Sequence, residues 1–180
     1  MSRWDTTHAA LREAALELFG TLGYDATTTA QVARRAGVTE MTLFRHFPTK
    51  EALLLSDPYD PLLAEAVRTR PPGEAPMAAL VAGIGQAWSR LPEADLAALG
   101  AVLAIVRGTP GLRGALERNA SATTDALAEA LIARGATPVA AAVAAAAAIA
   151  GLSAALLAWD PEERDLSDHL SEALDALAGR

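Results

Sequence analysis

The most constraining feature of the sequence is the stretch TTTAQVARRAGVTEMTLFRHFPTK at residues 27–50. It contains two helical patterns of about two turns each, joined by Ala36-Gly37-Val38-Thr39. A helix of two turns is unstable by itself in water, so these segments must pack on each other and on a neighbouring helix. The sequence therefore restricts the first 50 residues to a compact cluster of helices.

The residue types at this joint are typical of a helix-turn-helix motif at about 28–47. Ala33 is small enough to let the two helices cross closely, and Gly37 permits a turn with positive φ. Leu43 is placed to fill the space between the helices. The order of these three residues therefore favours two short helices that cross at a tight turn.

The ends of the two short helices are also marked in the sequence. Thr28 and Gln31 have the spacing of a capping box at the start of the first helix. Thr39 is of the N-cap type at the start of the second. Pro48 disfavours helical geometry at the residue before it, so the second helix is predicted to end near Phe47.

Helical periodicity continues along the rest of the chain, and no stretch shows the sustained alternation of a strand. Glycine and proline interrupt the pattern between segments. The first helix is expected to take its N-cap from Asp5, Thr6 or Thr7. The patterns predict an all-α chain of about nine helices, near 7–22, 28–35, 39–47, 49–68, 75–90, 93–107, 111–134, 138–159 and 166–178, with the fourth interrupted around 57–61.

Charge is distributed unevenly along the chain, whose net charge is −7. Residues 1–50 carry six basic and five acidic groups, a net charge of +1. Residues 51–180 carry nine basic and 17 acidic groups, a net charge of −8. The near-neutral residues 1–50 and the acidic residues 51–180 therefore indicate two parts with separate functions. The first part can approach a polyanion such as DNA.

The outer face of the helix at 39–47 has side chains suited to a DNA major groove, which is about 12 Å wide. These side chains are Glu40, Met41, Phe44, Arg45 and His46. Arg45 is expected to contact a base. Phe44 is assigned equally to an apolar DNA contact or to packing. His46 is expected to pack against the first helix and to leave one nitrogen for a phosphate.

The helix at 28–35 is predicted to lie across the DNA backbone. Thr28 and Thr29, with the amides beside them, can then meet phosphates. Lys50 is placed to meet another phosphate, while Phe47 is expected in the core because it lies four residues after Leu43.

The segment TTTAQVARRAGVTEMTLFRHFPTKEALL resembles the DNA-binding segment of the TetR family of bacterial transcription regulators. The resemblance includes the threonine-rich helix start, the A-x-x-AGVT turn and the run TLFRHFPTKEALL, and it covers residues 8–55. It implies a three-helix DNA-binding domain at 1–55, followed by a helical ligand-binding and dimerisation domain at 56–180. The family often carries tyrosine at position 44, so Phe44 lacks the phosphate hydrogen bond of that ring.

The resemblance also implies a function. It suggests a cytoplasmic homodimer that binds an inverted-repeat operator in double-stranded DNA and acts as a repressor released by a small molecule. By position, it assigns base or phosphate contacts to Thr29, Thr39, Glu40, Met41, Thr42, Phe44, Arg45, His46 and Lys50.

A ligand pocket is implied between the helices predicted at 75–90, 93–107 and 111–134. The apolar residues there can equally be ordinary core. Few polar groups converge on them, which favours an apolar effector. The candidate pocket residues are Met77, Leu80, Ile84, Trp88, Leu99, Leu103 and Val106.

Residues 135–159 carry no charge, which makes them a transmembrane candidate by length. Pro138 shortens the span, however, and the heavier side chains follow a stripe. A central helix that contacts both its own domain and a partner is apolar all round in this way. We therefore predict no membrane contact and a dimer interface on this helix, and the resemblance implies that the helix at 166–178 shares it. The predicted interface residues are Val143, Ala147, Leu152, Leu156, Trp159, Leu170 and Leu174.

Other functional classes find little support in the sequence. The absence of cysteine excludes disulfides, thiolate metal sites and cysteine nucleophiles, and it is compatible with a reducing cytosol. Charges inside the N-terminal apolar pattern argue against a signal peptide. No catalytic motif, phosphate-binding loop or zinc spacing is present, so neither an enzyme nor a cofactor is expected.

The remaining alternative is a helical enzyme or metal-binding bundle with an incidental helix-turn-helix. Asp165, Asp168, His169 and Glu172 follow helical spacing and could supply metal ligands. Acidic residues in a first helical turn are also favoured by the helix dipole, which is the simpler explanation of this group.

Overall fold

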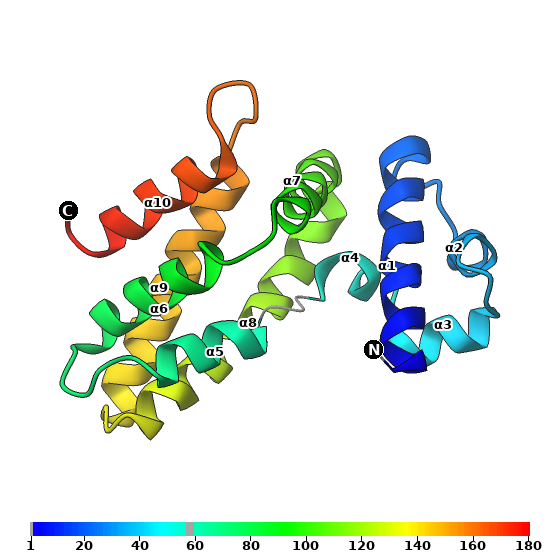
Figure 1. The fold of residues 1–180 in the computed structure, drawn as a ribbon. Coiled ribbons are helices and arrows are strands. Elements are labelled where there is room, and N and C mark those ends of the chain that lie inside the picture. Colours follow the sequence, from blue (N-terminus) through cyan, green and yellow to red (C-terminus); the bar gives the residue numbers. More distant parts are fainter. Residues whose placement is uncertain (1, 57–59) are drawn as a thin grey trace. The chain divides into compact units, whose positions relative to one another are not determined.

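The computed structural model describes residues 2–56 and 60–180, and every regular element in these ranges is helical (Figure 1). This confirms the all-α fold class. The elements are α1 Arg3–Leu22, α2 Thr29–Arg35, α3 Glu40–His46, α4 Ala52–Leu55, α5 Asp60–Arg68, α6 Pro76–Trp88, α7 Glu93–Gly108, the 3-10 turn η1 Pro110–Leu112, α8 Arg113–Ala133, α9 Pro138–Ala158 and α10 Leu166–Leu177.

The fourth predicted helix is divided into α4 and α5, so the described residues contain ten α-helices. Most of the interruption expected at 57–61 lies outside the described residues. The other predicted helices agree closely with the observed ones, except at the start of α1.

The helix α1 begins at Arg3, earlier than expected. Ser2 is its N-cap: the Ser2 hydroxyl accepts a hydrogen bond from the Asp5 amide at 3.1 Å, and the Asp5 carboxylate accepts one from the Ser2 amide at 2.8 Å. The expectation of an N-cap at Asp5, Thr6 or Thr7 was therefore wrong. The reciprocal pair satisfies two backbone donors and makes the earlier start favourable.

The chain forms two compact units. The first contains the residues up to 56 together with 98–116, and the second contains 60–97 together with 117–180. The functional division into a DNA-binding domain at 1–55 and a ligand-binding domain at 56–180 stays a prediction.

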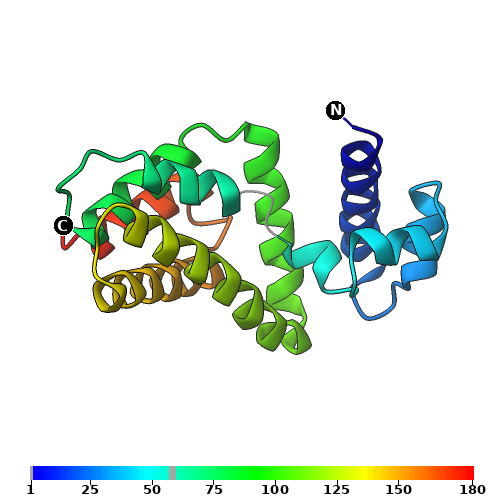
Figure 2. The same cartoon turned by 90° about the horizontal axis from the view of Figure 1, so that it is seen from below.

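In the first unit, α1 packs against α2 and α4, and α2 packs against α3 (Figure 2). Leu11, Phe19, Val32 and Leu43 are buried where these helices meet. The side chain of Arg12 donates a hydrogen bond to the backbone carbonyl of Ser56 at 2.9 Å. The short helices are thus held by a shared apolar core, as their length requires.

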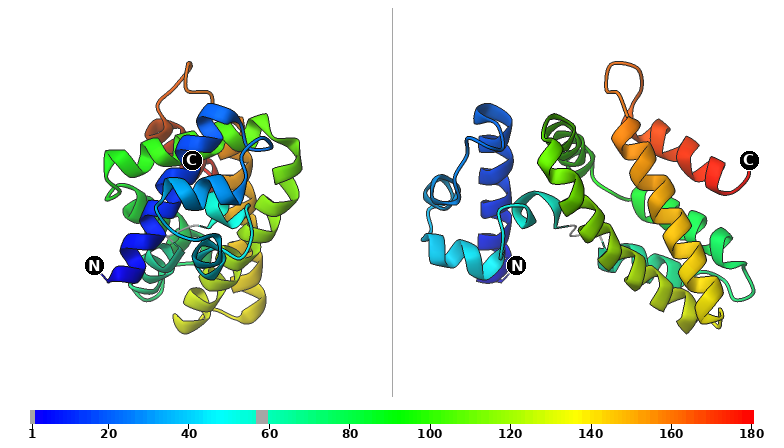
Figure 3. Two further views of the ribbon diagram at one scale, coloured as in Figure 1. Left: turned by 90° about the vertical axis from the view of Figure 1, so that its right-hand side faces the viewer. Right: turned by 180° about the vertical axis from the view of Figure 1, so that it is seen from behind.

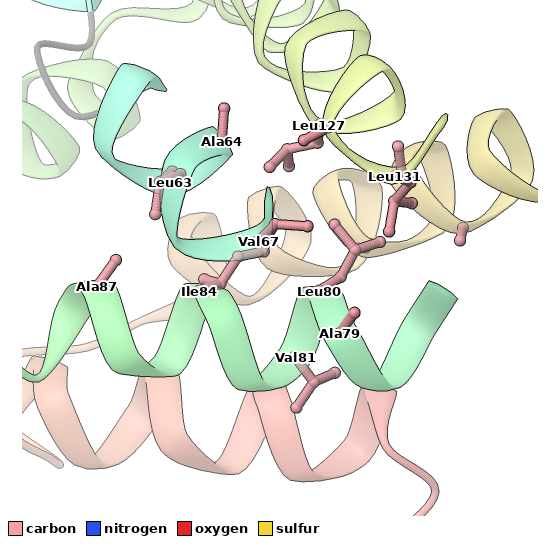
Figure 4. Close-up of a cluster of buried hydrophobic side chains, with 14 of the residues drawn as sticks. Leu63, Ala64, Val67, Ala79, Leu80, Val81, Ile84, Ala87, Leu127 and Leu131 are labelled. Atoms are coloured by element: carbon pink, nitrogen blue, oxygen red, sulfur yellow. The ribbon is translucent and has the colours of Figure 1, made fainter. Parts of the chain in front are cut away.

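The core of the second unit lies where α5, α6, α8 and α9 meet. Figure 4 shows side chains of α6 pointing toward α5 and α8, while Val81 points to the other side of α6. The buried side chains of this core include Leu63 and Val67 of α5, Leu80 and Ile84 of α6, and Leu127 and Leu131 of α8.

The helices α5 and α6 approach each other closely at Gly83. A Cβ atom added to Gly83 would lie 2.8 Å from Val67 Cγ2 and 3.0 Å from the Val67 backbone. Glycine is normally unfavourable inside a helix. Its presence here follows from the lack of space for any side chain against the α5 backbone.

Arg134, directly after α8, binds the C-terminal end of α5. Its guanidinium donates to the carbonyls of Val67 at 3.2 Å, Arg70 at 2.8 Å and Pro71 at 3.0 Å. Val67 lies in the last turn of α5, and Arg70 and Pro71 follow the helix, so one cationic side chain binds three backbone acceptors at this helix end and suits the helix dipole.

The uncharged helix α9 packs against α6 and α10 (Figure 3). One side of α9 is buried in the chain, through Ala141, Ala144, Ala145, Ala148 and Leu152. The opposite side is exposed and equally apolar. It is formed by Val139, Ala142, Val143, Ala146, Ala147, Ala150 and Ala154.

These positions correct part of the expected dimer interface. Leu152, Trp159, Leu170 and Leu174 are buried within the chain, and the Trp159 indole donates to the Arg164 carbonyl at 2.8 Å. These four therefore offer little surface to a partner. Val143, which is 64% exposed, and Ala147 remain available, and Leu156 is half-buried.

Among the described residues, α9 is the one single helix long and apolar enough to cross a membrane. Length and composition alone do not separate such a span from an interior helix. The burial of one α9 face against α6 and α10 instead makes it a packed element of the second unit.

Candidate nucleic-acid interface

The helix-turn-helix is built as the sequence predicts. Thr28 caps α2 in a complete capping box with Gln31, and Thr39 caps α3 by accepting from the Thr42 amide at 3.2 Å. Gly37 has a φ of 71°, which glycine adopts readily. Leu43 is fully buried. The turn and the core contact therefore fix the crossing of α2 and α3.

The outer face of α3 is accessible to solvent. Met41 is 67% exposed and Phe44 is 45% exposed, so two large apolar side chains of α3 face solvent. Arg45 is also exposed, and its Nη2 lies 3.7 Å from Met41 Sδ. Among the described residues no carboxylate pairs with Arg45. Its guanidinium is therefore free to donate to a base or a phosphate.

Three of the predicted DNA-contacting threonines have local hydrogen bonds. The Thr28 hydroxyl lies 3.0 Å from Gln31 Oε1, and the hydroxyls of Thr39 and Thr42 lie 2.9 Å apart. Each of these bonds is local to the first turn of its own helix. Their contact with DNA stays a prediction.

Thr29 and Glu40 join the beginnings of α2 and α3. The Thr29 hydroxyl donates to Glu40 Oε1 at 2.5 Å. Sequence reasoning missed this contact because it links residues from two helices, and neither helical spacing nor capping rules indicate it. The Thr29 hydroxyl was expected to donate a hydrogen bond to a phosphate. In the structure it donates to the Glu40 carboxylate instead.

Lys50 is held beside the turn that precedes α2. Its ammonium group donates to the Tyr24 carbonyl at 2.5 Å and lies 4.1 Å from the centre of the Tyr24 ring. Burial raises the pKa of Tyr24 to about 12, and Glu51 and Asp25 add to the effect. An ammonium has three donors, so this bond leaves two for other acceptors. The phosphate contact of Lys50 stays a prediction.

His46 packs against α1, as predicted. Its ring stacks on Trp4 with centroids 3.6 Å apart, and the His8 ring lies 5.6 Å from it. His8 in turn stacks on Phe47, which is buried as expected. The Nδ1 atoms of both histidines are buried and have no hydrogen-bond partner among the described residues. The end of α3 is thus anchored to α1 by stacked rings.

This ring cluster makes stability depend on pH. Burial lowers the pKa of His8, and the nearby His46 and Arg12 lower it further, while Asp5 opposes them. The unfolded chain therefore takes up a proton on His8 at higher pH than the folded chain does. Stability from neutral His8 is present above the usual histidine pKa of about 6.5 and is lost as pH falls below it.

The measurement is urea unfolding between pH 8 and pH 5 for the parent protein and for His8→Gln. Other groups titrate in both proteins, so the difference between their unfolding free energies isolates His8. We expect a constant difference above pH 7 and a decreasing advantage of the parent below pH 6.5. An unchanged difference across the whole range would contradict a lowered His8 pKa.

The predicted effector-pocket residues lie in different environments. Leu80 and Ile84 are fully buried in the second unit, and Met77 and Trp88 pack at the edge of the same core. Leu99, Leu103 and Val106 belong to the first unit. Their assignment to an effector pocket stays a prediction.

An open hollow of about 460 Å³ lies on the other side of α6, against α10. Its lining includes Val81, Gly85 and Leu174, with Glu74, Asp175 and Arg180 at charged positions. No sequence pattern indicates this hollow, because it depends on how α10 packs on α6.

Two of the four candidate metal ligands, His169 and Glu172, have other partners. His169 Nε2 donates to the Ala155 carbonyl at 2.8 Å, and Glu172 forms an ion pair with Arg164. Within the residues that the structure describes, no group of three His, Asp or Glu side chains is arranged to hold a metal ion.

The sequence of the helix-turn-helix is similar to those of known regulators. The model of the family described as bacterial regulatory proteins, tetR family, matches residues 11–56. The HTH-type transcriptional regulator TcmR of Streptomyces glaucescens is 32% identical over 136 residues, which cover 72% of this chain and 60% of TcmR. The match thus extends over less than two thirds of that relative.

Solved structures extend the similarity to nearly the whole chain. NalD of Pseudomonas aeruginosa, the secondary repressor of the MexAB-OprM multidrug efflux pump, is 25% identical, with 98% of this chain and 96% of NalD covered and a TM-score of 0.56. FadR of Thermus thermophilus, a repressor solved in complex with lauroyl-CoA, is 24% identical, with 95% and 93% covered and a TM-score of 0.56.

Proposed function

The chain belongs to the TetR family of bacterial regulatory proteins, and from this premise we propose that it is a ligand-responsive, dimeric repressor of transcription. The observation that carries the proposal is the exposed outer face of α3, which presents Met41, Phe44 and Arg45 on the second helix of a capped helix-turn-helix. Large apolar side chains in such a position are suited to base edges and thymine methyl groups.

The proposed DNA target is an inverted repeat. A dimer with two-fold symmetry presents two copies of α3, and their half-sites are expected about one helical turn apart, ~34–36 Å. Residues 1–50 carry a net charge of only +1, so attraction to DNA in general is weak. Selectivity must then come from the side chains of α3.

The proposed homodimer uses the exposed side of α9 together with α10. This side carries no charge along the helix, and small alanine side chains permit a partner helix to approach closely. A stable dimer is expected to bury roughly 1,200–2,000 Å² in total or more. The alternative occupant of this side of α9 is a lipid bilayer. The net charge of −7 and the many charged residues elsewhere in the chain favour a protein partner instead.

The proposed effector is a small, largely apolar molecule bound by the second unit. The similar FadR was solved with lauroyl-CoA, and NalD is described as a repressor of a multidrug efflux pump. Binding of such a molecule would favour dimers whose two α3 helices do not match the operator spacing, so DNA and effector would weaken each other's binding. A cytoplasmic location follows from this role.

An enzyme or metal-binding bundle is the rival proposal. The relatives are transcription regulators, and the former metal candidates His169 and Glu172 bond to Ala155 and Arg164. Selection from a pool of random double-stranded DNA tests the two proposals. Enrichment of a palindrome supports the repressor, whereas no enrichment at low salt would support the rival.

Two substitutions should separate base contacts from backbone contacts at this interface. Arg45→Ala should cost about 1–3 kcal/mol per half-site and relax preference at one position, which we expect to be a guanine. Lys50→Ala should weaken operator and random DNA alike and reduce the salt slope by about one unit for each phosphate that the lysine binds. Fluorescence anisotropy on both DNAs at several salt concentrations measures these effects.

The two variants also serve as controls for each other. Equal losses of affinity for operator and random DNA in Arg45→Ala would mean that this arginine contacts a phosphate. An unchanged salt slope for Lys50→Ala would mean that its ammonium stays on the Tyr24 carbonyl in the complex.

A further inference from the structure

The carboxylate of Glu40 is an unusual group for a surface that meets DNA. Glu40 is exposed at the start of α3, and Oε1 accepts the proton of the Thr29 hydroxyl. Within the part of the chain that the structure describes, no basic side chain forms an ion pair with Glu40. Its negative charge is therefore not neutralised by an ion pair on the surface that α3 presents.

The charge of this carboxylate limits what it can contact. An ionised carboxylate only accepts hydrogen bonds, and DNA phosphates carry negative charge and offer no proton. Base edges in the major groove provide donors at two amino groups only, N4 of cytosine and N6 of adenine. Glu40 can thus be accommodated in the groove only against an amino group.

Cytosine suits this carboxylate better than adenine. Adenine presents the N7 acceptor beside its N6 donor, so the second oxygen of a carboxylate would face a lone pair. Cytosine has no acceptor of its own beside N4 in the major groove. The Thr29 hydroxyl occupies one oxygen of Glu40 and leaves Oε2 to accept from the base.

We propose that Glu40, positioned by Thr29, selects cytosine at one position of each half-site and weakens binding to all other DNA. The inference rests on the proposed function and assigns a specificity element within it. Thr29 is a positioning residue, since its proton is donated to Glu40 rather than to a phosphate. Residues 1–50 carry a net charge of only +1, so their attraction to DNA in general is weak. Repulsion between Glu40 and the phosphates weakens this attraction further.

The test is selection from random double-stranded DNA with the parent protein, Glu40→Gln and Glu40→Ala. For the parent we expect a palindrome with one invariant cytosine per half-site. Glutamine pairs with adenine through both N6 and N7, so Glu40→Gln should move this one preference from cytosine toward adenine. Glu40→Ala should lose the preference at that position, and both variants should keep the others.

The same variants should bind random DNA more tightly. We expect the affinity of Glu40→Gln for random DNA to rise several-fold at low salt. The gain should be smaller at high salt, because ions screen the repulsion that the substitution removes. If the variants lose the cytosine preference but bind random DNA no more tightly, the claim that Glu40 weakens binding to other DNA is overturned.

Thr29 is tested with a matched pair. Thr29→Ser keeps the hydroxyl and should keep the cytosine preference. Thr29→Val keeps the shape of the side chain but loses the hydroxyl, so other bases should be accepted at that position. Urea unfolding of both variants monitors folding, and a merely structural role for Thr29 would lower stability without changing the selected base. Equal base preference in Thr29→Ser and Thr29→Val would overturn the positioning role.

The outcomes distinguish this inference from the proposed function. If the parent protein selects no sequence, the proposed function itself fails. If the parent selects a palindrome and Glu40→Gln selects the same one at every position, the function stands and the assignment of Glu40 to cytosine is overturned.

Discussion

Ala147→Glu should convert the dimer into monomers and reduce operator affinity by about 10²–10⁴-fold, the gain that a second linked site provides. Ala147 lies on the exposed, uncharged side of α9, between Val143 and Ala150. A glutamate there would have its charge buried without a partner in a helix–helix interface, which is strongly unfavourable. Light scattering and anisotropy on the selected palindrome measure both effects.

The monomer itself should tolerate the change, because Ala147 is exposed in the single chain and glutamate is a good helix former. Ala94→Glu is a matched control, since Ala94 is an exposed alanine in the first turn of α7. The control should remain dimeric with full affinity. A dimeric Ala147→Glu protein at micromolar concentration would place the interface elsewhere.

Gly83→Ala should destabilise the second unit by about 1–3 kcal/mol, the usual cost of overpacking. The new methyl would lie 2.8 Å from Val67 Cγ2 and 3.0 Å from the backbone of α5, which cannot move without separating the two helices. The effect should appear although alanine is favoured over glycine in a helix by about 1 kcal/mol. Urea unfolding gives the free energy directly.

Gly85→Ala provides the comparison on the same helix. A Cβ there would meet only the Cδ1 atom of the Leu174 side chain at 3.3 Å, and that side chain can move. We expect Gly85→Ala to leave the free energy of unfolding almost unchanged or to raise it slightly. If Gly83→Ala were as stable as Gly85→Ala, the close crossing of α5 and α6 at Val67 would be wrong.

Helix positions were largely predictable because their signals are local. Pro138 and the caps Thr28 and Thr39 mark starts through backbone chemistry that needs no tertiary contact. The start of α1 was misplaced even though Ser2 and Asp5 have capping-box spacing, because several later residues are also good N-caps.

The side-chain partners at the interface could not be predicted in the same way. Glu40 and Lys50 were placed on DNA from their position in the motif, but Thr29 and the Tyr24 carbonyl bind them in the free chain. These contacts depend on the crossing of α2 and α3 and on the turn before α2. Helical spacing identifies a face and cannot show which groups of another element lie opposite.

The sides of α9 were not separable from sequence because almost every residue of this helix is apolar. Heavy side chains suggested an interface that included Leu152 and Trp159, whereas these pack inside the chain. The exposed side is instead formed mainly by alanines such as Ala146 and Ala147. A hydrophobic pattern without polar positions carries no information about orientation.

The bond of Arg134 to the end of α5 has a consequence for the order of folding. Its acceptors, the carbonyls of Val67, Arg70 and Pro71, precede it by 63 to 67 residues. A contact that closes so long a loop is expected after the local helices have formed, late on the folding pathway. Interactions made after the transition state slow unfolding and leave the folding rate almost unchanged. We therefore expect Arg134 to lengthen the lifetime of the folded second unit without speeding its formation.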